Sequence, residues 1–277
     1  METYFVTGST GYIGAPLTSR LSSDGHRVVA LSRKHSSVGH GMGKDFSIDQ
    51  AFLDLEKRSY SHLEKLGVSG STVIDLAWDF SNRSHSEQTK DHVAFAKAVT
   101  ELGAARLVVP GTLFELGFDQ GLVDETSPRL GDSEHGKAKT DLFHSLTDLL
   151  KHNQSTFLWP RIHYVFGNDS SSRSVFGRIE RSSKPFVLNP RQGAFDFIQL
   201  DKLVSILIEL LKTEGSGAID IGSGHPQTFH EVVSKWLFEK GLNPTEYLGS
   251  AVSGAQQIPR GTWPRLKKLA NLLGEPK

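Results

Sequence analysis

Residues 6–14 read VTGSTGYIG, a glycine-rich turn that decides the fold of this chain. Gly8, Gly11 and Gly14 follow an apolar strand and precede a predicted helix, with the spacing G-x-x-G-x-x-G. Glycine permits a tight turn and lets backbone N–H groups approach a ligand without side chains in the way. Because such N–H groups at a helix N-terminus bind phosphate, the strand, the turn and the helix together predict a dinucleotide site.

The rest of the chain alternates short apolar runs with longer helical patterns. The strands are rich in Val, Ile and Leu on both alternations, which is typical of a parallel sheet with helices on both faces. We therefore expect a doubly wound α/β fold of the Rossmann type, with its ligand at the carboxyl edge of the sheet. The expected strands are 4–8, 27–33, 50–55, 72–78, 106–112, 155–167 and 217–224, and the expected helices are 12–25, 92–103, 201–213 and 228–242.

Two lobes are expected within one chain. A dinucleotide-binding domain is predicted over residues 1–160, and a smaller C-terminal lobe over residues 161–277. The second lobe is expected to bind mainly the substrate and to send segments back to the sheet. Stretches rich in Ser, Asn, Gly and Gln at 168–174 and 249–261 are predicted loops.

Composition excludes several classes of protein. Lys+Arg and Asp+Glu both number 31, so the chain carries no basic excess of the kind that nucleic-acid binding requires. The absence of cysteine excludes disulfides and thiolate chemistry, and the twelve histidines show no convincing metal-binding spacing. No signal-peptide pattern or membrane-spanning apolar run is present, so a cytoplasmic protein without a membrane partner or a metal is expected.

The end of the second strand indicates which dinucleotide binds. An NAD site usually places a carboxylate there for the ribose 2′-hydroxyl, whereas an NADP site places a cation there for the 2′-phosphate. Here the strand ends in Ser32, Arg33 and Lys34, with no acidic residue in reach. A guanidinium matches phosphate geometry with two hydrogen bonds, so NADP(H) is favoured over NAD(H).

Several further motifs resemble those of the extended short-chain dehydrogenase/reductase family, in its nucleotide-sugar epimerase, dehydratase and reductase branch. The motifs occur in the family's order, and they are TGSTGYIG (7–14), FLDLEK (52–57), VIDLAW (73–78), LVVPGTLFELG (107–117), WPRIHYVFG (159–167), FDFIQLDKL (195–203) and GAIDIGSGHPQTFHEVV (217–233). The cofactor contacts that the turn, the strand end and the resemblance together imply are Gly8, Thr10, Gly11, Tyr12, Ile13, Gly14, Ser32, Arg33, Asp54, Leu55, Leu76, Ala77, Trp78, Lys139 and Ile162.

The resemblance implies a catalytic Tyr-x-x-x-Lys pair, which this chain lacks in that form. The match after Thr112 is His135-Gly-Lys-Ala-Lys139, just ahead of a predicted helix, and no tyrosine occurs between Tyr60 and Tyr164. The four-residue spacing puts His135 and Lys139 on one helical face. We therefore expect Thr112 to bind the substrate oxygen, His135 to replace the tyrosine as the proton donor or acceptor, and Lys139 to bind the cofactor ribose.

Two alternatives for His135 stay open from the sequence. In one, the substrate or another side chain supplies the acid or base, and His135 only shapes the pocket. In the other, redox chemistry is lost and the protein binds its cofactor as a regulatory protein.

The favoured function is reduction of a 4-keto-6-deoxy nucleotide sugar, and the nearest enzymatic alternative is an epimerase or dehydratase that retains its NAD(P). The resemblance also implies a homodimer. The expected substrate contacts are Phe114, His163, Tyr164, Arg191 and Arg260, where the two arginines would replace diphosphate-binding arginines that the family has elsewhere.

Overall fold

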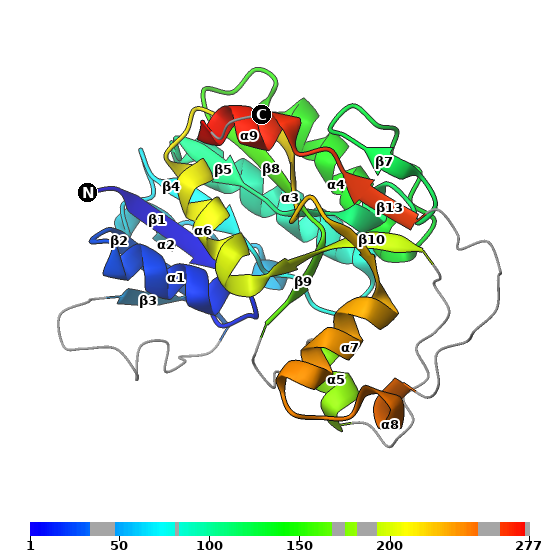
Figure 1. Cartoon of the computed structure of the whole chain (residues 1–277). Helices are drawn as coiled ribbons and strands as arrows, with labels where there is room; N and C mark the ends of the chain where they lie inside the picture. The colour runs from blue at the N-terminus through cyan, green and yellow to red at the C-terminus, as the bar shows by residue number, and fades with distance from the viewer. Residues whose placement is uncertain (34–47, 81–82, 168–174, 182–192, 249–260, 275–277) are drawn as a thin grey trace.

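The computed structural model describes residues 1–33, 48–80, 83–167, 175–181, 193–248 and 261–274. Its main sheet is wholly parallel and has the strand order β11-β8-β5-β4-β1-β2-β3, with β6 beside β8. The order reverses at β1, which pairs with both β2 and β4 (Figure 1). The predicted doubly wound fold is confirmed. The strands are β1 (Thr3–Thr7), β2 (Arg27–Ser32), β3 (Ile48–Phe52), β4 (Thr72–Asp75), β5 (Arg106–Val108), β6 (Gly111–Thr112), β8 (Thr156–Ile162) and β11 (Gly217–Ile221).

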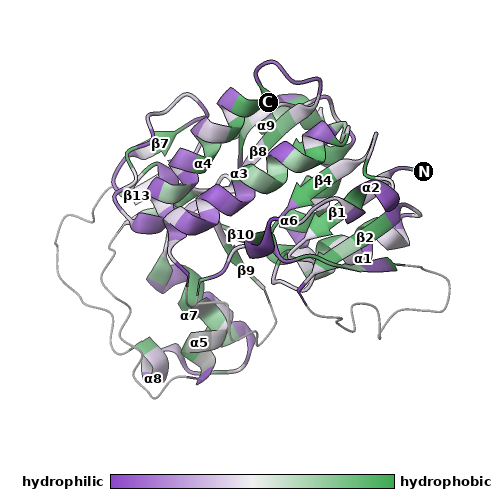
Figure 2. Cartoon of the chain, turned by 180° about the vertical axis from the view of Figure 1, so that it is seen from behind, coloured by the Kyte–Doolittle hydropathy of each residue, from purple (hydrophilic) through white to green (hydrophobic). Residues whose placement is uncertain are grey.

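Helices cover both faces of this sheet because the side chains of each strand alternate between two apolar cores. From β1, Tyr4 and Val6 join the core beneath α1 (Gly14–Ser23), α6 (Leu200–Leu211) and α9 (Lys267–Leu273). Phe5 joins the opposite core, beneath α3 (His85–Glu101) and α4 (Glu134–Leu150). Figure 2 shows α3 and α4 side by side on this second face, with polar residues turned outward. The short α2 (His62–Lys65) and the 3-10 turn η1 (Leu55–Lys57) lie between β3 and β4 in the chain.

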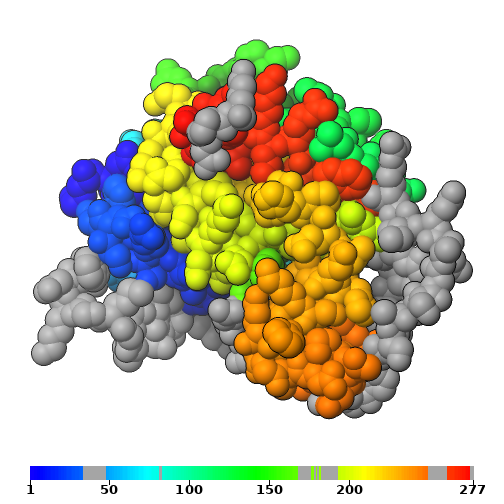
Figure 3. All heavy atoms as spheres, viewed as in Figure 1, coloured from blue at the N-terminus to red at the C-terminus, as the bar shows by residue number. Residues whose placement is uncertain are grey.

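A second, smaller sheet has the order β12-β10-β13-β7, with β9 beside β10. Aromatic residues of β10 pack with α5 (Val175–Arg181), α7 (Phe229–Glu239) and α8 (Pro244–Leu248) in a third core. These three helices lie together, apart from the main sheet, in Figure 1, and the orange residues of α7 and α8 project from the rest of the surface in Figure 3. The chain crosses between the sheets in both directions, because β7 precedes residue 160 and β11 follows it. The strands are β7 (Gly121–Val123), β9 (Tyr164–Phe166), β10 (Ala194–Gln199), β12 (Pro226–Thr228) and β13 (Gly261–Pro264).

Some boundaries differ from the sequence prediction. The strand expected over 155–167 divides at His163, because β9 pairs with β10 of the second sheet. The helix expected from residue 92 already begins at His85, where the Ser84 hydroxyl accepts the N–H of Glu87. The stretch 133–140, expected just ahead of a helix, is itself the first two turns of α4, and the Ser133 hydroxyl accepts the N–H of Gly136.

Thr228 caps α7 through a reciprocal pair of hydrogen bonds. The Thr228 hydroxyl accepts the N–H of Glu231, whose carboxylate in turn accepts the N–H of Thr228. None of the helices in the described ranges is long and apolar enough to cross a membrane.

Candidate active site

The glycine turn between β1 and α1 is too tight for side chains. A Cβ added to Gly14 would lie 2.1 Å from the carbonyl oxygen of Gly8, and one added to Gly8 would lie 2.8 Å from the backbone N of Ala77. Gly8 also has a φ of +62°. The N–H of Gly11 donates to the carbonyl oxygen of Gly8 at 2.8 Å, which closes the turn. The turn therefore holds backbone N–H groups at the start of α1, as a pyrophosphate site requires.

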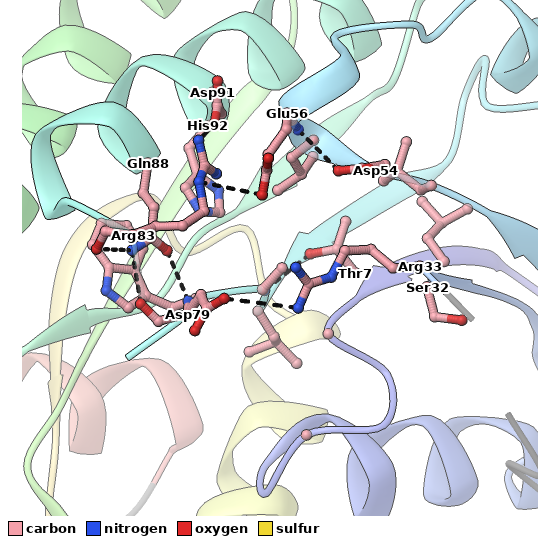
Figure 4. Close-up of a pocket in the computed structure, with 18 of the residues that line it drawn as sticks. Thr7, Ser32, Arg33, Asp54, Glu56, Asp79, Arg83, Gln88, Asp91 and His92 are labelled. Atoms are coloured by element: carbon pink, nitrogen blue, oxygen red, sulfur yellow. Dashed lines mark hydrogen bonds and ion pairs between the residues drawn. The ribbon is translucent and has the colours of Figure 1, made fainter. Parts of the chain in front are cut away.

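A cavity of about 220 Å³ opens beside this turn, at the carboxyl edge of the main sheet. Many of the predicted cofactor contacts line it, so motifs far apart in the chain meet there (Figure 4). The predicted residues that line it are Gly8, Thr10, Gly11, Ser32, Arg33, Asp54, Leu55, Leu76, Ala77 and Trp78. The other lining residues are Thr7, Leu31, Leu53, Glu56, Asp79, Arg83, Gln88, Asp91 and His92.

A buried polar network fixes the floor of the cavity. The Thr7 hydroxyl donates to Oδ1 of Asp75 at 2.5 Å and accepts the N–H of Ala77 at 3.1 Å. The other carboxylate oxygen of Asp75 lies 2.5 Å from Nδ1 of His92. The His92 ring stacks on Trp78 with an interplanar angle of 13°. Since each member is held by another, the Trp78 ring has a fixed position at the cavity wall.

Lys139 lies against the opposite side of this wall. Its ammonium is 4.1 Å from the centre of the Trp78 ring and donates to the carbonyl oxygen of Pro110 at 3.0 Å. Burial lowers the pKa of Lys139 to about 8, although the negative charges of Asp75 and Glu115 oppose that change. The side chain therefore still carries its positive charge at neutral pH.

His135 stands one turn before Lys139 on α4, in an aromatic pocket. Its ring centre lies between 5.1 and 5.9 Å from those of Trp78, Phe80, His85 and Phe114. Burial, then the charge of Lys139 and then that of His85, lower the pKa of His135 to about 3. The ring is therefore neutral at physiological pH. Its Nδ1 is buried and has no hydrogen-bond partner within the described part of the chain.

Thr112 is positioned by a carboxylate that the sequence motifs do not single out. Thr112 caps the 3-10 turn η2 (Leu113–Glu115), and its N–H donates to Oε1 of Glu115 at 2.7 Å. Glu115 is fully buried, and its carboxylate also accepts from the indole of Trp159 and pairs with Arg129 at 3.2 Å. Burial raises the pKa of Glu115, and the nearby arginines oppose this. This network holds Thr112 beside the first turn of α4, where η2 packs.

Two of the predicted substrate contacts lie around this centre and one does not. Phe114 contacts both His135 and Tyr164, with ring centres 5.9 Å apart in each case. His163 is instead buried, and its Nε2 lies 3.3 Å from Oδ1 of Asp220, which also pairs with Arg161. Burial by itself would raise the pKa of Asp220, but the hydrogen bonds from His163 and Arg161 and the charge of Arg161 outweigh it and lower the pKa to about 2. Arg191 and Arg260 lie outside the described residues.

The remaining predicted contacts take other positions. Lys139 and His135 do not line the cavity, but both contact Trp78, which does. Thr112 lies beside η2 and α4. Tyr12, Ile13 and Gly14 form the part of the turn behind the cavity, and Ile162 is buried in the core beneath α1 and α6. In the ranges that the structure describes, no group of three His, Asp or Glu side chains is arranged to hold a metal ion.

One face of α3 lines the cavity, although none of its residues is among the predicted contacts. Gln88, Asp91 and His92 are spaced i, i+3 and i+4, so they share one side of the helix. The spacing predicts a shared face only if the helix begins at His85, and the sequence pattern placed its start at residue 92. The same face brings Asp91 to Arg83 at 2.6 Å, and Arg83 also pairs with Glu56 at 3.2 Å.

Comparisons with known proteins bear on this geometry. A model of the NAD dependent epimerase/dehydratase family matches residues 4–222. The chain is 27% identical over 251 residues to a dTDP-6-deoxy-L-talose 4-dehydrogenase (NAD(+)) of Aggregatibacter actinomycetemcomitans, covering 86% of this chain and 90% of the relative. It is 24% identical to a dTDP-6-deoxy-L-talose 4-dehydrogenase (NAD(P)(+)) of Kitasatospora kifunensis, over 87% and 80% of the two chains. Among solved structures, MoeE5 in complex with UDP-glucuronic acid and NAD superposes with a TM-score of 0.78 at 22% identity, over 99% of this chain and 93% of that one.

Proposed function

The chain belongs to the NAD dependent epimerase/dehydratase family, and from that premise we propose that it is an NADP(H)-dependent reductase of a nucleotide-activated 4-keto-6-deoxy sugar. The observation that carries the proposal is the position of Trp78. This residue lines the cavity at the glycine turn and contacts both His135 and Lys139. His135 and Lys139 therefore lie one side chain away from the cavity in which the cofactor would bind.

The residues of the cavity fit a dinucleotide. The turn at Gly8, Gly11 and Gly14 leaves no room for a Cβ at Gly14 and would hold the pyrophosphate through backbone N–H groups. Asp54 and Leu55 line the part of the cavity that would hold the adenine, and Arg33 lines the part that would hold a ribose 2′-phosphate. When bound, the nicotinamide would supply the hydride to the sugar carbon.

The neutral state of His135 suits the ring to donate a hydrogen bond rather than to accept a proton. A ring with a pKa of about 3 is a poor base at neutral pH, so it is ill suited to remove a proton from a sugar hydroxyl. A neutral imidazole can still donate one N–H, and it acts in this way as an electrophile in other enzymes. In the proposed reaction His135 donates this hydrogen bond to the 4-keto oxygen. This hydrogen bond stabilises the developing alkoxide, which takes its proton from solvent, so that His135 stays neutral throughout.

Lys139 and Thr112 have supporting roles in the proposal. The Lys139 ammonium would hold the ribose hydroxyls, and its charge would favour negative charge on the neighbouring substrate oxygen. The hydroxyl of Thr112 accepts the N–H of Phe114 at 3.4 Å, which leaves its own O–H to donate to the same oxygen. The sugar ring would lie against Phe114 and Tyr164, whose aromatic faces suit an apolar sugar surface. The named relatives, both 4-dehydrogenases of a dTDP-linked 6-deoxy sugar, support the substrate class.

The test is to mix the purified protein with NADPH and a panel of 4-keto-6-deoxy nucleotide sugars, and to follow the absorbance of the reduced nicotinamide. Oxidation of NADPH by one sugar would support the proposal and identify that sugar. Conversion of a sugar without net change in NADPH would favour the epimerase or dehydratase alternative. Binding of NADPH with neither reaction would favour the regulatory alternative.

Variants of His135 separate chemistry from binding. We expect His135→Phe to lose nearly all turnover while it binds NADPH as the wild type does, because an aromatic ring is kept and the N–H is lost. His135→Tyr should regain activity over the Phe variant. Equal activity of the Phe variant and the wild type would show that His135 only shapes the pocket.

A further inference from the structure

Arg33, the residue proposed to bind a 2′-phosphate, is held by a carboxylate in this structure. Its guanidinium lies 3.8 Å from Oδ2 of Asp79, and Figure 4 shows the Arg33 side chain turned toward that residue. Both residues line the cavity at the glycine turn. A guanidinium cannot make its best contacts with a carboxylate and a phosphate at different places at once, because both need its planar set of N–H donors.

The backbone of Asp79 is held in place by Gln88. Its backbone N–H donates to Oε1 of Gln88, and its carbonyl oxygen accepts from Nε2 of the same side chain, both at 2.7 Å. Gln88 itself is buried on α3. Arg33 in contrast has a side chain that is 61% exposed, so its movement gives up little buried contact with the described residues. A ligand that attracts Arg33 would therefore draw the arginine away from a carboxylate whose backbone stays in place.

The other arginine at the cavity is already engaged. Arg83 pairs with Asp91 at 2.6 Å and with Glu56 at 3.2 Å, and its side chain is 23% exposed. Recruitment of Arg83 to a phosphate would break two close ion pairs. Of the two arginines that line the cavity in the described ranges, Arg33 is the one that can turn to an anionic ligand at small cost.

We propose that Asp79 is a specificity-determining residue that competes with the ribose 2′-phosphate for Arg33. The inference rests on the proposed function, since it assumes that a nicotinamide dinucleotide binds in this cavity. With NADP(H), Arg33 must leave Asp79, and the carboxylate also repels the phosphate. With NAD(H), Arg33 stays on Asp79 and no anion meets the carboxylate. Asp79 thus weakens the binding of NADP(H) but not that of NAD(H), and it reduces the preference for NADP(H) over NAD(H) that Arg33 creates.

The test is to titrate NADPH and NADH into the wild type, Asp79→Asn, Arg33→Ala and the double variant, and to measure the four pairs of dissociation constants. The Asn side chain can keep the shape of Asp79 while it removes the charge. Asp79→Asn removes an exposed ion pair and the repulsion between Asp79 and the phosphate. We therefore expect NADPH to bind about two- to tenfold more tightly to this variant. NADH binding should stay within about twofold, on the same grounds.

Two further variants show whether the effect passes through Arg33. Asp79→Asn should tighten NADPH binding much less when Arg33 is already Ala, because no guanidinium remains to be released. Glu56→Gln removes another carboxylate of the same cavity, one that pairs with Arg83, and should change the NADPH to NADH ratio less than Asp79→Asn does.

The outcomes separate the inference from the proposed cofactor. A wild type that prefers NADH would contradict the NADP(H) assignment, while a shift toward NADPH in Asp79→Asn would still uphold the role of Asp79. An unchanged ratio in Asp79→Asn would overturn that role whatever the wild type prefers. An equal gain in the Arg33→Ala background would also overturn it, because the carboxylate would then act without Arg33.

Discussion

The Lys139 ammonium lies 4.1 Å from the centre of the Trp78 ring, on a side chain that is only 7% exposed. A charged group at this depth is disfavoured by the loss of water, and this is the main cause of its lowered pKa of about 8. The cation is partly compensated by the aromatic face and by the carbonyl oxygen of Pro110. This arrangement has consequences for the pH dependence of both activity and stability.

The pH profile of kcat/KM should follow Lys139 and not His135. Lys139 is protonated below about pH 8 and neutral above it, so activity that needs the ammonium should fall as the pH rises through about 8. His135 has a pKa of about 3 and stays neutral throughout, so no inflection is expected near pH 6.5. Initial rates between pH 5 and pH 9.5 would check this. An inflection near pH 6.5 that disappears in His135→Phe would contradict the neutral state of His135.

Lys139→Met should stabilise the protein at pH 7. The pKa of Lys139 is lowered on folding, so the unfolded chain binds more protons between about pH 8 and pH 10.5. The cost of burying the ammonium is therefore fully present below pH 8 and is relieved as the pH rises toward 10.5. We expect a gain of about 1–3 kcal/mol in the free energy of unfolding at pH 7, which shrinks toward pH 10. Urea unfolding of both proteins at several pH values measures it, and a gain that is constant with pH would point to packing.

Gly14→Ala should impair cofactor binding. The added Cβ would lie 2.1 Å from the Gly8 carbonyl oxygen, so the turn must shift and its N–H groups must lose their positions. We expect NADPH affinity to fall by at least about tenfold, on the scale of one or more lost charge-assisted hydrogen bonds. Gly70→Ala is the control, because Gly70 has a φ of +71° and open space around its Cβ position. That variant should lose about 1–2 kcal/mol of stability and keep its NADPH affinity.

Glu115→Gln should be strongly destabilising. The carboxylate is fully buried and faces Arg129, whose side chain is 9% exposed, so the variant leaves a buried positive charge without its partner. A loss of about 3–5 kcal/mol in the free energy of unfolding is expected. The double variant Glu115→Leu/Arg129→Met removes both charges and should recover much of that loss. Chemical denaturation at pH 7 compares the proteins, and a double variant less stable than the single one would argue against an electrostatic cause.

The parts of the fold that depend on local sequence were predictable. The glycine turn, the buried strands of the main sheet and the cap at Thr228 each follow from residues within a few positions of one another. The strands of the second sheet were not predictable in this way. β7, β12 and β13 have only three or four residues, too few for a periodic pattern, and they form through pairing with β10 or with each other.

Features of the site that depend on a local motif were predictable from the sequence. Features that depend on tertiary contacts were not. The spacing of His135 and Lys139 predicted a shared helical face, and the structure places them on one. The low pKa of His135 depends on Trp78, Phe80 and His85, which the chain brings from other segments. His163 was assigned to the substrate from its motif, yet its position is set by Asp220, 57 residues away. No local sequence pattern predicts a contact between residues this far apart in the chain.

Arg161 is a point at which the two sheets are tied together. From β8 of the main sheet, its guanidinium donates to the Asp220 carboxylate on β11 at 2.7 and 2.6 Å. It also donates, at 2.8 Å, to the carbonyl oxygen of Asp124, the residue after β7 of the second sheet. Separation of the sheets here would leave one buried N–H group of the guanidinium without its acceptor, although the pair with Asp220 would stay intact. The two sheets are therefore preorganised relative to each other, and a ligand that touches both would bind with little loss of conformational entropy from the protein.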